Sequence, residues 1–207
     1  MIKISTSILS SNNREECIKN LNNTETDYIH IDVMDGAFVP NKQFTIKEII
    51  NLSKISNKPL DIHLMVTNPI KYIKKIIHID NIEYITFHLE INKNIDKLIT
   101  YIKKHNKKCC LSIKPNTKVT ELNDYLDKID MILIMSVEPG YGGQEFIPNT
   151  INKIKELKEL TNKLIEVDGG INNITINDIK NDIDIAVIGS YITNSNDYNK
   201  TINELKN

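Results

Sequence analysis

The sequence alternates eight times between a short strand-like run of β-branched and other apolar residues and a stretch whose apolar residues have helical spacing. The strand-like runs cover residues 2–9, 27–33, 60–66, 84–89, 108–113, 131–137, 164–167 and 183–188. The helix-like stretches cover residues 14–21, 46–55, 69–79, 95–105, 119–126, 150–160, 174–179 and 198–205. Eight such units of about 26 residues predict an α/β fold, a single-domain (β/α)8 TIM barrel that takes up the whole chain, residues 1–207.

An open, doubly wound parallel sheet is the competing architecture. Such a sheet normally has fewer strands, and its first strand-to-helix turn carries glycines when it binds a dinucleotide. Here that turn reads Leu9-Ser10-Ser11-Asn12 and contains no glycine. The barrel is therefore the favoured prediction.

Six of the predicted strands alternate polar and apolar residues in the same phase. Because successive side chains of a strand point to opposite sides, one set lines the barrel interior and the other faces the helices. The predicted interior set consists of Ser5, Ser7, His30, Asp32, Asp61, His63, Thr86, His88, Ser112, Lys114, Glu166 and Asp168. Polar residues near the C-terminal strand ends predict an active site at that end of the barrel. We assign no role to His88 or Lys114 from the sequence.

Within this set, imidazoles and carboxylates recur at a spacing that places them on one face. His30 and Asp32 share a face of the second predicted strand, Asp61 and His63 share a face of the third, and Asp168 ends the seventh. Neutral imidazoles with carboxylates suit one divalent ion such as Zn, Fe(II), Co or Mn. The alternative is that each is a structural polar group with its hydrogen bonds satisfied.

The glycines are concentrated at one end of the predicted barrel. Six of the seven lie in the last three strand-to-helix loops, as Gly140, Gly142, Gly143, Gly169, Gly170 and Gly189. Glycine lets backbone N–H groups approach an anion, and these loops of a TIM barrel frequently hold a phosphate. Their clustering predicts a phosphate cradle rather than a set of unrelated turns.

Three methionines, Met34, Met65 and Met135, stand beside the candidate ligands. Methionine usually fills gaps in a core, but around a polar barrel mouth it can also exclude water from a reactive intermediate.

The composition limits the partners and the compartment. The formal net charge of −1 and the lack of a basic cluster argue against nucleic acid. The longest apolar run, Met131 to Met135, is far shorter than the ~18 residues that cross a membrane. The N-terminus lacks the pattern of a signal peptide, and the three cysteines form neither a disulfide framework nor a thiolate zinc motif. We expect a cytoplasmic protein that acts as a homo-oligomer, without a membrane or nucleic-acid partner.

Several motifs, spread from the first to the last predicted strand, resemble those of the ribulose-phosphate 3-epimerase family, also called pentose-5-phosphate 3-epimerases. The segments that carry the resemblance are Ser7–Ser10 (SILS), His30–Asn41 (HIDVMDGAFVPN), Leu60–Val66 (LDIHLMV), Met135–Pro148 (MSVEPGYGGQEFIP), Glu166–Ile171 (EVDGGI) and Gly189-Ser190. They occur in the order in which the family has them.

This resemblance implies specific roles. It implies a divalent metal ion held by His30, Asp32, His63 and Asp168, with Asp32 and Asp168 also acting as the catalytic acid and base. It implies an isomerase that interconverts D-ribulose 5-phosphate and D-xylulose 5-phosphate at C3, a step of the pentose phosphate pathway of carbohydrate metabolism. The residues implied to bind the substrate and its phosphate are Ser7, His63, Gly140, Tyr141, Gly142, Gly143, Asp168, Gly169, Gly170, Gly189 and Ser190. Met34, Met65 and Met135 are implied to surround the reacting carbons.

Physical chemistry agrees with two carboxylates and a metal. A proton next to a ketone is too weakly acidic for a carboxylate unless the resulting enediolate is stabilised, and a metal ion provides that stabilisation. Inverting one carbon with a single base would require the intermediate to turn over. Two carboxylates on opposite faces avoid this, and their acid and base roles exchange with the direction of reaction.

Three alternatives stay open at this point. One is a 3-epimerase of a related ketose phosphate such as D-allulose 6-phosphate, which could use the same groups. Another is a decarboxylase or aldolase-type lyase, although Asp32 is followed by Val33 and Met34 and not by the Asp-x-Lys-x-x-Asp pattern of such barrels. The third is a barrel that binds a sugar phosphate without catalysis, for which paired carboxylates beside a metal would be unnecessary.

Overall fold

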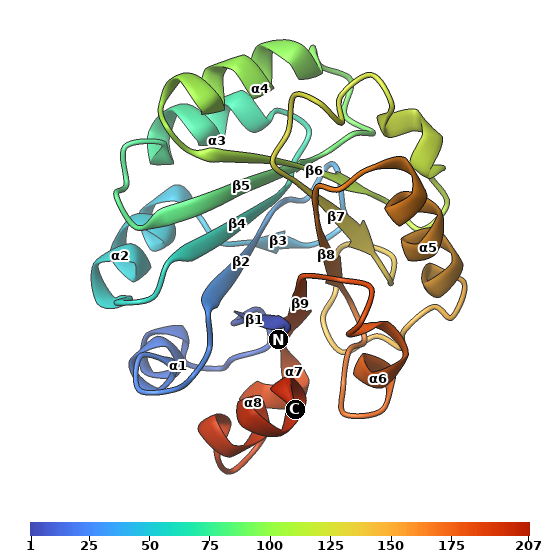
Figure 1. The fold of residues 1–207 in the computed structure, drawn as a ribbon. Coiled ribbons are helices and arrows are strands. Elements are labelled where there is room, and N and C mark those ends of the chain that lie inside the picture. Colours follow the sequence, from blue (N-terminus) through green and yellow to red (C-terminus); the bar gives the residue numbers. More distant parts are fainter.

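Eight parallel strands close into a barrel, because β1 pairs with both β2 and β9 (Figure 1). The computed structural model describes residues 1–207. The barrel strands are β1 (Lys3–Ser7), β2 (Tyr28–Asp35), β4 (Leu60–Met65), β5 (Ile82–His88), β6 (Lys108–Ile113), β7 (Met131–Met135), β8 (Leu164–Asp168) and β9 (Ile185–Ile188). Each strand except the closing pair lies beside its neighbours in the sequence, so the prediction of a TIM barrel is confirmed.

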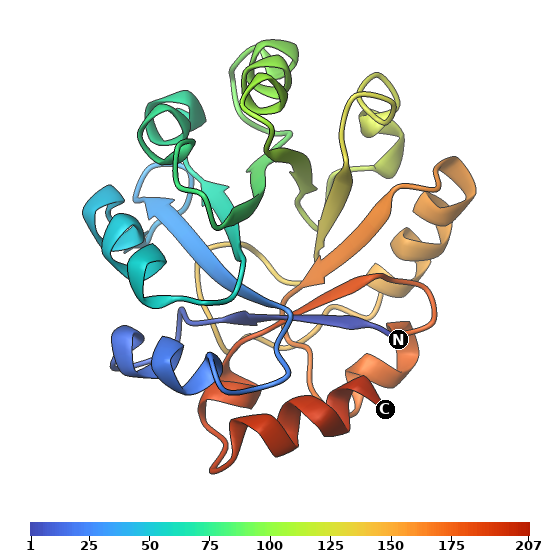
Figure 2. The ribbon, with the colours of Figure 1, turned by 60° about the vertical axis from the view of Figure 1, so that its left-hand side comes forward.

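Helices surround the barrel on its outer side (Figure 2). They are α1 (Arg14–Leu21), α2 (Ile46–Ile55), α3 (Pro69–Ile76), α4 (Ile95–Lys104), the 3₁₀ helix η1 (Val119–Leu122), α5 (Thr150–Leu160), α6 (Thr175–Ile179), α7 (Ser190–Thr193) and α8 (Tyr198–Lys206). The largest apolar cluster joins the outward strand residues, such as Ile31, Ile62 and Ile134, to helix residues such as Ile73 and Leu157. Burial of this layer between strands and helices is the main favourable contribution to folding.

Three elements differ from the sequence prediction. The helix expected over 119–126 is only the 3₁₀ helix η1 followed by turns, because Thr120, Asn123 and Asp124 are poor helix formers. The four-residue helix α7 is too short to show a helical period. The two-residue strand β3 (Lys42–Gln43) pairs antiparallel with the end of β2, outside the barrel proper.

The predicted interior residues are inside the barrel. Those on β1, β2, β4, β5 and β6 are buried, as is Glu166 on β8, whereas Asp168 is half-buried at the strand end. Lys114 follows the last residue of β6 and is half-buried like Asp168, and its Nζ lies 4.2 Å from the centre of the Phe38 ring.

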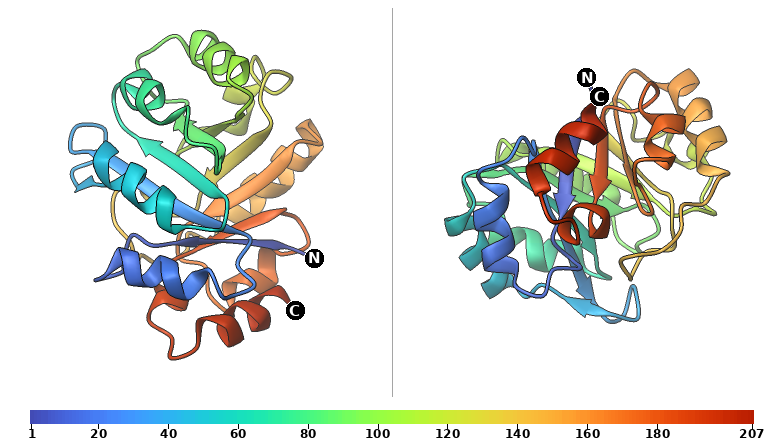
Figure 3. Two further views of the ribbon diagram at one scale, coloured as in Figure 1. Left: turned by 90° about the vertical axis from the view of Figure 1, so that its left-hand side faces the viewer. Right: turned by 90° about the horizontal axis from the view of Figure 1, so that it is seen from below.

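Helix α8 packs against β1 and the segment before β2, and the two termini lie near each other (Figure 3). Lys206 on α8 forms an ion pair with Asp27, with Nζ 2.7 Å from Oδ2, and donates to the backbone oxygen of Glu25. None of the helices has the length and hydropathy that a bilayer crossing requires.

Candidate active site

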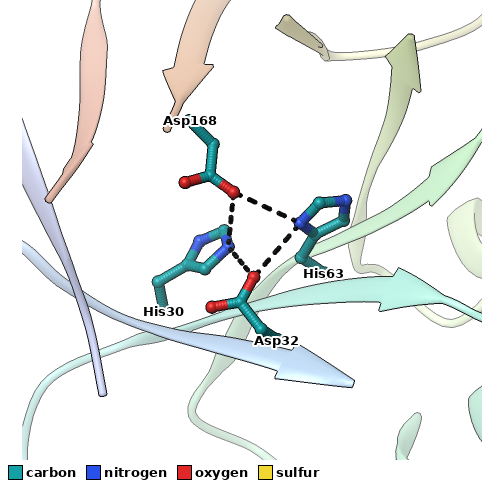
Figure 4. Close-up of side chains that lie close together, drawn as sticks. All are labelled: His30, Asp32, His63 and Asp168. Carbon is teal, nitrogen blue, oxygen red and sulfur yellow. Dashed lines mark ion pairs between the residues drawn. The ribbon is translucent and has the colours of Figure 1, made fainter. Parts of the chain in front are cut away.

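Four side chains from three strands converge in the barrel: His30 and Asp32 from β2, His63 from β4 and Asp168 from β8 (Figure 4). Nε2 of His30 lies 3.2 Å from Oδ1 of Asp32 and 3.9 Å from Oδ2 of Asp168. Nδ1 of His63 lies 3.4 Å and 3.6 Å from the same two oxygens. The structure therefore brings together the four residues predicted as metal ligands.

The position of His30 is fixed from behind by a carboxylate. Its Nδ1 lies 2.6 Å from Oδ2 of Asp61, which also accepts a hydrogen bond of 2.9 Å from the Ser5 hydroxyl. A carboxylate only accepts hydrogen bonds, so Nδ1 of His30 carries the proton of this contact. Nε2 of His30 is then directed at Asp32 and Asp168.

The site fits a divalent cation. Nε2 of His30 and Nδ1 of His63 are buried and have no hydrogen-bond partner, although each faces two carboxylate oxygens. Two ligands bound tetrahedrally at about 2.1 Å lie about 3.4 Å apart. The observed separations of 3.2–3.9 Å match that spacing.

The surrounding charges favour a positive group at this point. Burial on its own lowers the pKa of His30, but the carboxylates of Asp61 and Asp32 raise that pKa well above its ordinary value. Burial likewise opposes ionisation of Asp32, yet His30 and His63 hold its pKa far below the usual range. Deeper in the barrel, burial and the charge of Asp61 raise the pKa of Glu166.

A cavity of about 750 Å³ opens above the cluster at the C-terminal ends of the strands. Asp32 and Asp168 reach its floor, while His30 and His63 lie buried beneath it. The other predicted residues that line the cavity are Ser7, Met34, Met65, Met135, Gly140, Tyr141, Gly142, Gly143, Gly169, Gly170, Gly189 and Ser190. Every predicted site residue thus lies on the cavity wall or directly under it.

Glycine is required where the loops around this cavity approach each other. Gly170 has a φ of +64°, and a Cβ there would lie 2.3 Å from the backbone nitrogen of Phe146. A Cβ on Gly142 would lie 2.5 Å from the hydroxyl of Ser10. The loops after β7 and β8 therefore pack together only because Gly170 lacks a side chain, whereas the Ser10 hydroxyl could rotate away from a Cβ on Gly142.

The match to a family model decides the identity of the chain. The model described as the ribulose-phosphate 3 epimerase family matches residues 3–193. The chain belongs to the ribulose-phosphate 3-epimerase family. The family is one of epimerases, which are enzymes of the isomerase class.

Curated relatives agree with the family assignment over nearly the full length. The ribulose-phosphate 3-epimerase of Buchnera aphidicola subsp. Baizongia pistaciae is 40% identical over 214 residues, with 98% of this chain and 93% of that protein covered. The Bacillus subtilis ribulose-phosphate 3-epimerase is 36% identical, with 100% and 99% covered. The Escherichia coli K12 protein of the same name is 37% identical, with 87% and 83% covered.

Solved structures of other enzymes share the fold of this epimerase-family chain. A tryptophan synthase α-subunit from Pyrococcus furiosus matches with a TM-score of 0.75 at 14% identity, covering 99% of this chain and 97% of that one. The 3-hexulose-6-phosphate synthase of Salmonella typhimurium matches with a TM-score of 0.72 at 16% identity, again covering 99% and 97%. At such identities the likeness concerns the barrel alone.

The structure of this family member also shows cavity residues that the sequence analysis missed. Ser10, Gln144, Asn172, Thr175, Asn194 and Ser195 line the cavity with polar side chains. Ser136 lies under it and donates to the backbone oxygens of Asp168 and Gly169, at 2.8 and 2.6 Å. Ser136 immediately follows β7 within a quoted motif, which is a signal that could have identified it.

Proposed function

We propose that this chain is a metal-dependent epimerase that interconverts D-ribulose 5-phosphate and D-xylulose 5-phosphate at C3. The observation that carries the proposal is the meeting of two carboxylates, Asp32 and Asp168, from different strands at the floor of one cavity. A binding protein would have no need of two such carboxylates at the site of a cation. Membership of the epimerase family supports the same reaction.

In this proposal Asp32 and Asp168 exchange protons with C3 from opposite faces. One carboxylate removes the C3 proton of D-ribulose 5-phosphate, and the other delivers a proton to the face that becomes exposed. In the reverse direction the two residues exchange roles. The Ser7 hydroxyl donates to Oδ2 of Asp32 at 2.7 Å, which orients that carboxylate toward the cavity.

His30, Asp32, His63 and Asp168 would hold one divalent ion, of which Zn, Fe(II), Co and Mn suit two imidazoles and two carboxylates. The ion would supply positive charge beside the substrate oxygens that become negative when the C3 proton leaves. Asp61 holds His30 in the tautomer that ligation requires, because it accepts the proton of Nδ1.

The remaining cavity residues would position the substrate. Met34, Met65 and Met135 line the cavity beside Asp32 and Asp168, and would exclude water from the reacting carbons. No lysine or arginine lines the cavity, so backbone N–H groups and hydroxyls would bind the phosphate. The residues proposed for this are Gly140, Tyr141, Gly142, Gly143, Gly169, Gly170, Gly189 and Ser190.

A side-by-side assay of two sugars tests the substrate. Metal-loaded protein is expected to convert D-ribulose 5-phosphate with a higher kcat/KM than D-allulose 6-phosphate. A higher kcat/KM for D-allulose 6-phosphate would show that the hexulose phosphate is the preferred substrate of the same 3-epimerase reaction.

Removal of the metal tests the cation site. Chelation should abolish turnover, and added divalent metal should restore it, whereas full activity of the chelated protein would contradict the metal part of the proposal. The pentose phosphate pathway, the cytoplasm and a homo-oligomeric state stay predictions.

A further inference from the structure

A second histidine lies behind His63 and has no part in the chemistry proposed above. His88, at the end of β5, is fully buried and does not line the cavity. Its Nε2 lies 2.9 Å from Nε2 of His63, and its Nδ1 lies 3.2 Å from Oε2 of Glu90. His63, His88 and Glu90 thus form a continuous chain of contacts that leads away from the candidate metal ligands.

The carboxylate of Glu90 determines which atom is the donor in each of these hydrogen bonds. Glu90 is a carboxylate and can only accept, so Nδ1 of His88 carries a proton and donates to it. A neutral imidazole has one donor and one acceptor, so Nε2 of His88 then accepts from Nε2–H of His63. The proton of His63 is therefore on Nε2, and the lone pair on Nδ1 faces Asp32 and Asp168.

Glu90 is itself held from the other side. Its Oε1 accepts from the backbone N–H of Lys114 at 2.7 Å and from the Thr117 hydroxyl. The buried Lys153 on α5 fixes the same loop, because its Nζ donates to the backbone oxygens of Lys114 and Pro115, at 2.6 and 3.2 Å. Oε2 of Glu90 is thereby left to face His88.

The rings of this chain are also packed in place. The His63 and His88 rings are stacked, with centres 5.0 Å apart. Phe38, in the loop after β2, packs against His88, with ring centres 4.8 Å apart. His88 therefore has contacts that restrict both its rotation and its position.

We propose that Glu90, acting through His88, is a positioning residue that holds His63 in the tautomer that binds the divalent ion. The inference rests on the cation site of the proposed function. Removing a group that orients a metal ligand typically weakens metal binding about 10- to 100-fold.

The variant Glu90→Gln would reverse the donor-to-acceptor direction of the hydrogen bond between residue 90 and His88. Its amide oxygen would keep the contacts to Lys114 and Thr117, so its NH₂ group would face Nδ1 of His88. His88 would then carry its proton on Nε2, opposite Nε2–H of His63, and His63 would lose the tautomer that ligation needs. His88→Phe removes the acceptor for His63 while keeping an aromatic ring against Phe38.

The matched control is Glu83→Gln. Glu83 lies on β5, the strand that ends at His88, and its carboxylate pairs at the surface with Lys108, with Nζ 2.6 Å from Oε1. If the loss of one carboxylate charge near His88 were enough to weaken Zn²⁺ binding, Glu83→Gln and Glu90→Gln would be affected alike.

The experiment measures the dissociation constant of Zn²⁺ by competition with a chelator, together with thermal unfolding of the metal-free proteins. We expect about 10- to 100-fold weaker Zn²⁺ binding in Glu90→Gln and His88→Phe, and wild-type binding in Glu83→Gln. Unchanged affinity in both folded variants overturns the inference while leaving the cation site of the wild-type protein intact. A wild-type protein that binds no Zn²⁺, Fe²⁺, Co²⁺ or Mn²⁺ would contradict the metal part of the proposed function instead.

The ¹⁵N NMR spectrum of the histidines in the Zn²⁺-loaded wild-type protein tests the inference even if a variant fails to fold. The expected result is a proton on Nε2 of His63 and on Nδ1 of His88. The opposite tautomer of His88 would overturn the inference without affecting the proposed reaction.

Discussion

Asp32 and Asp168 are held differently, although both face the same cation site. Asp32 is buried, accepts from Ser7 and contacts both imidazoles, so its orientation is fixed. Asp168 ends β8, and 16% of its side-chain surface is exposed to solvent. The more exposed carboxylate, Asp168, is therefore the one whose charge can be removed with less disturbance of the barrel interior.

Asp168→Asn is expected to fold and, even when saturated with Zn²⁺, to show turnover lowered by about 10²- to 10⁴-fold, because an amide cannot accept the C3 proton. The measurement is kcat for D-ribulose 5-phosphate, with Zn²⁺ content and thermal unfolding as checks. Asp178→Asn, an exposed residue on α6, is the control and should match the wild type. Wild-type turnover in Asp168→Asn would refute the two-carboxylate mechanism.

Glu90 is expected to make stability depend on acid pH. Burial alone would raise the pKa of Glu90, but His88, Lys114 and Thr117 lower it to about 2 from an ordinary value of 4.5. Since the folded-state pKa is the lower one, this stability is present above pH 4.5 and is lost as the pH falls toward 2.

The loss between pH 5 and pH 3 should be smaller, by at most about 2 kcal/mol, in metal-free Glu90→Gln than in metal-free wild type, because His88, whose pKa burial lowers to about 4, takes up a proton in the same window in both proteins. Urea unfolding at the two pH values measures it. Equal losses in the two proteins would show that Glu90 has an ordinary pKa in the folded state.

At the scale of the elements, the strands could be predicted from the sequence better than the segments between them. The β-branched runs identified all eight barrel strands, because the residues facing the helices must be apolar whichever strand they are in. Helix α7 and strand β3 are too short to carry a period, and η1 replaces a predicted helix. Their conformations depend on neighbouring loops that a local pattern does not describe.

The loops around the cavity give a prediction that separates backbone strain from steric overlap. Gly143 and Gly170 have similar φ values, +73° and +64°, but a Cβ on Gly143 would meet nothing within 4 Å. A Cβ on Gly170 would overlap the backbone at Phe146. Gly143→Ala should cost only the strain of the left-handed conformation, about 1–2 kcal/mol.

Gly170→Ala should carry the same strain and also displace the loop after β7, so we expect a larger loss of stability and a raised KM for the ketose phosphate. Thermal unfolding and steady-state kinetics of both variants test this. A wild-type KM in Gly170→Ala would show that close packing of these loops is not needed for substrate binding.

At the scale of the whole molecule, the candidate ligands could be predicted because a closed barrel brings the ends of distant strands together. His30, His63 and Asp168 are far apart in the sequence, yet strand phase alone placed them on one interior surface. The hydrogen-bonded partner of each imidazole could not be predicted in this way. That His88 meets His63, and Asp61 meets His30, depends on side-chain rotamers and on the register between strands.

The central claim is that Asp32 and Asp168 remove and return the C3 proton from opposite faces. The most direct test is the first turnover of metal-loaded wild-type protein in D₂O, with the C3 position of the product followed by NMR. The account predicts D-xylulose 5-phosphate that carries solvent deuterium at C3, because the carboxylate that delivers the proton has equilibrated with solvent. Product that retains the substrate's own C3 hydrogen, or no product at all, would contradict the account.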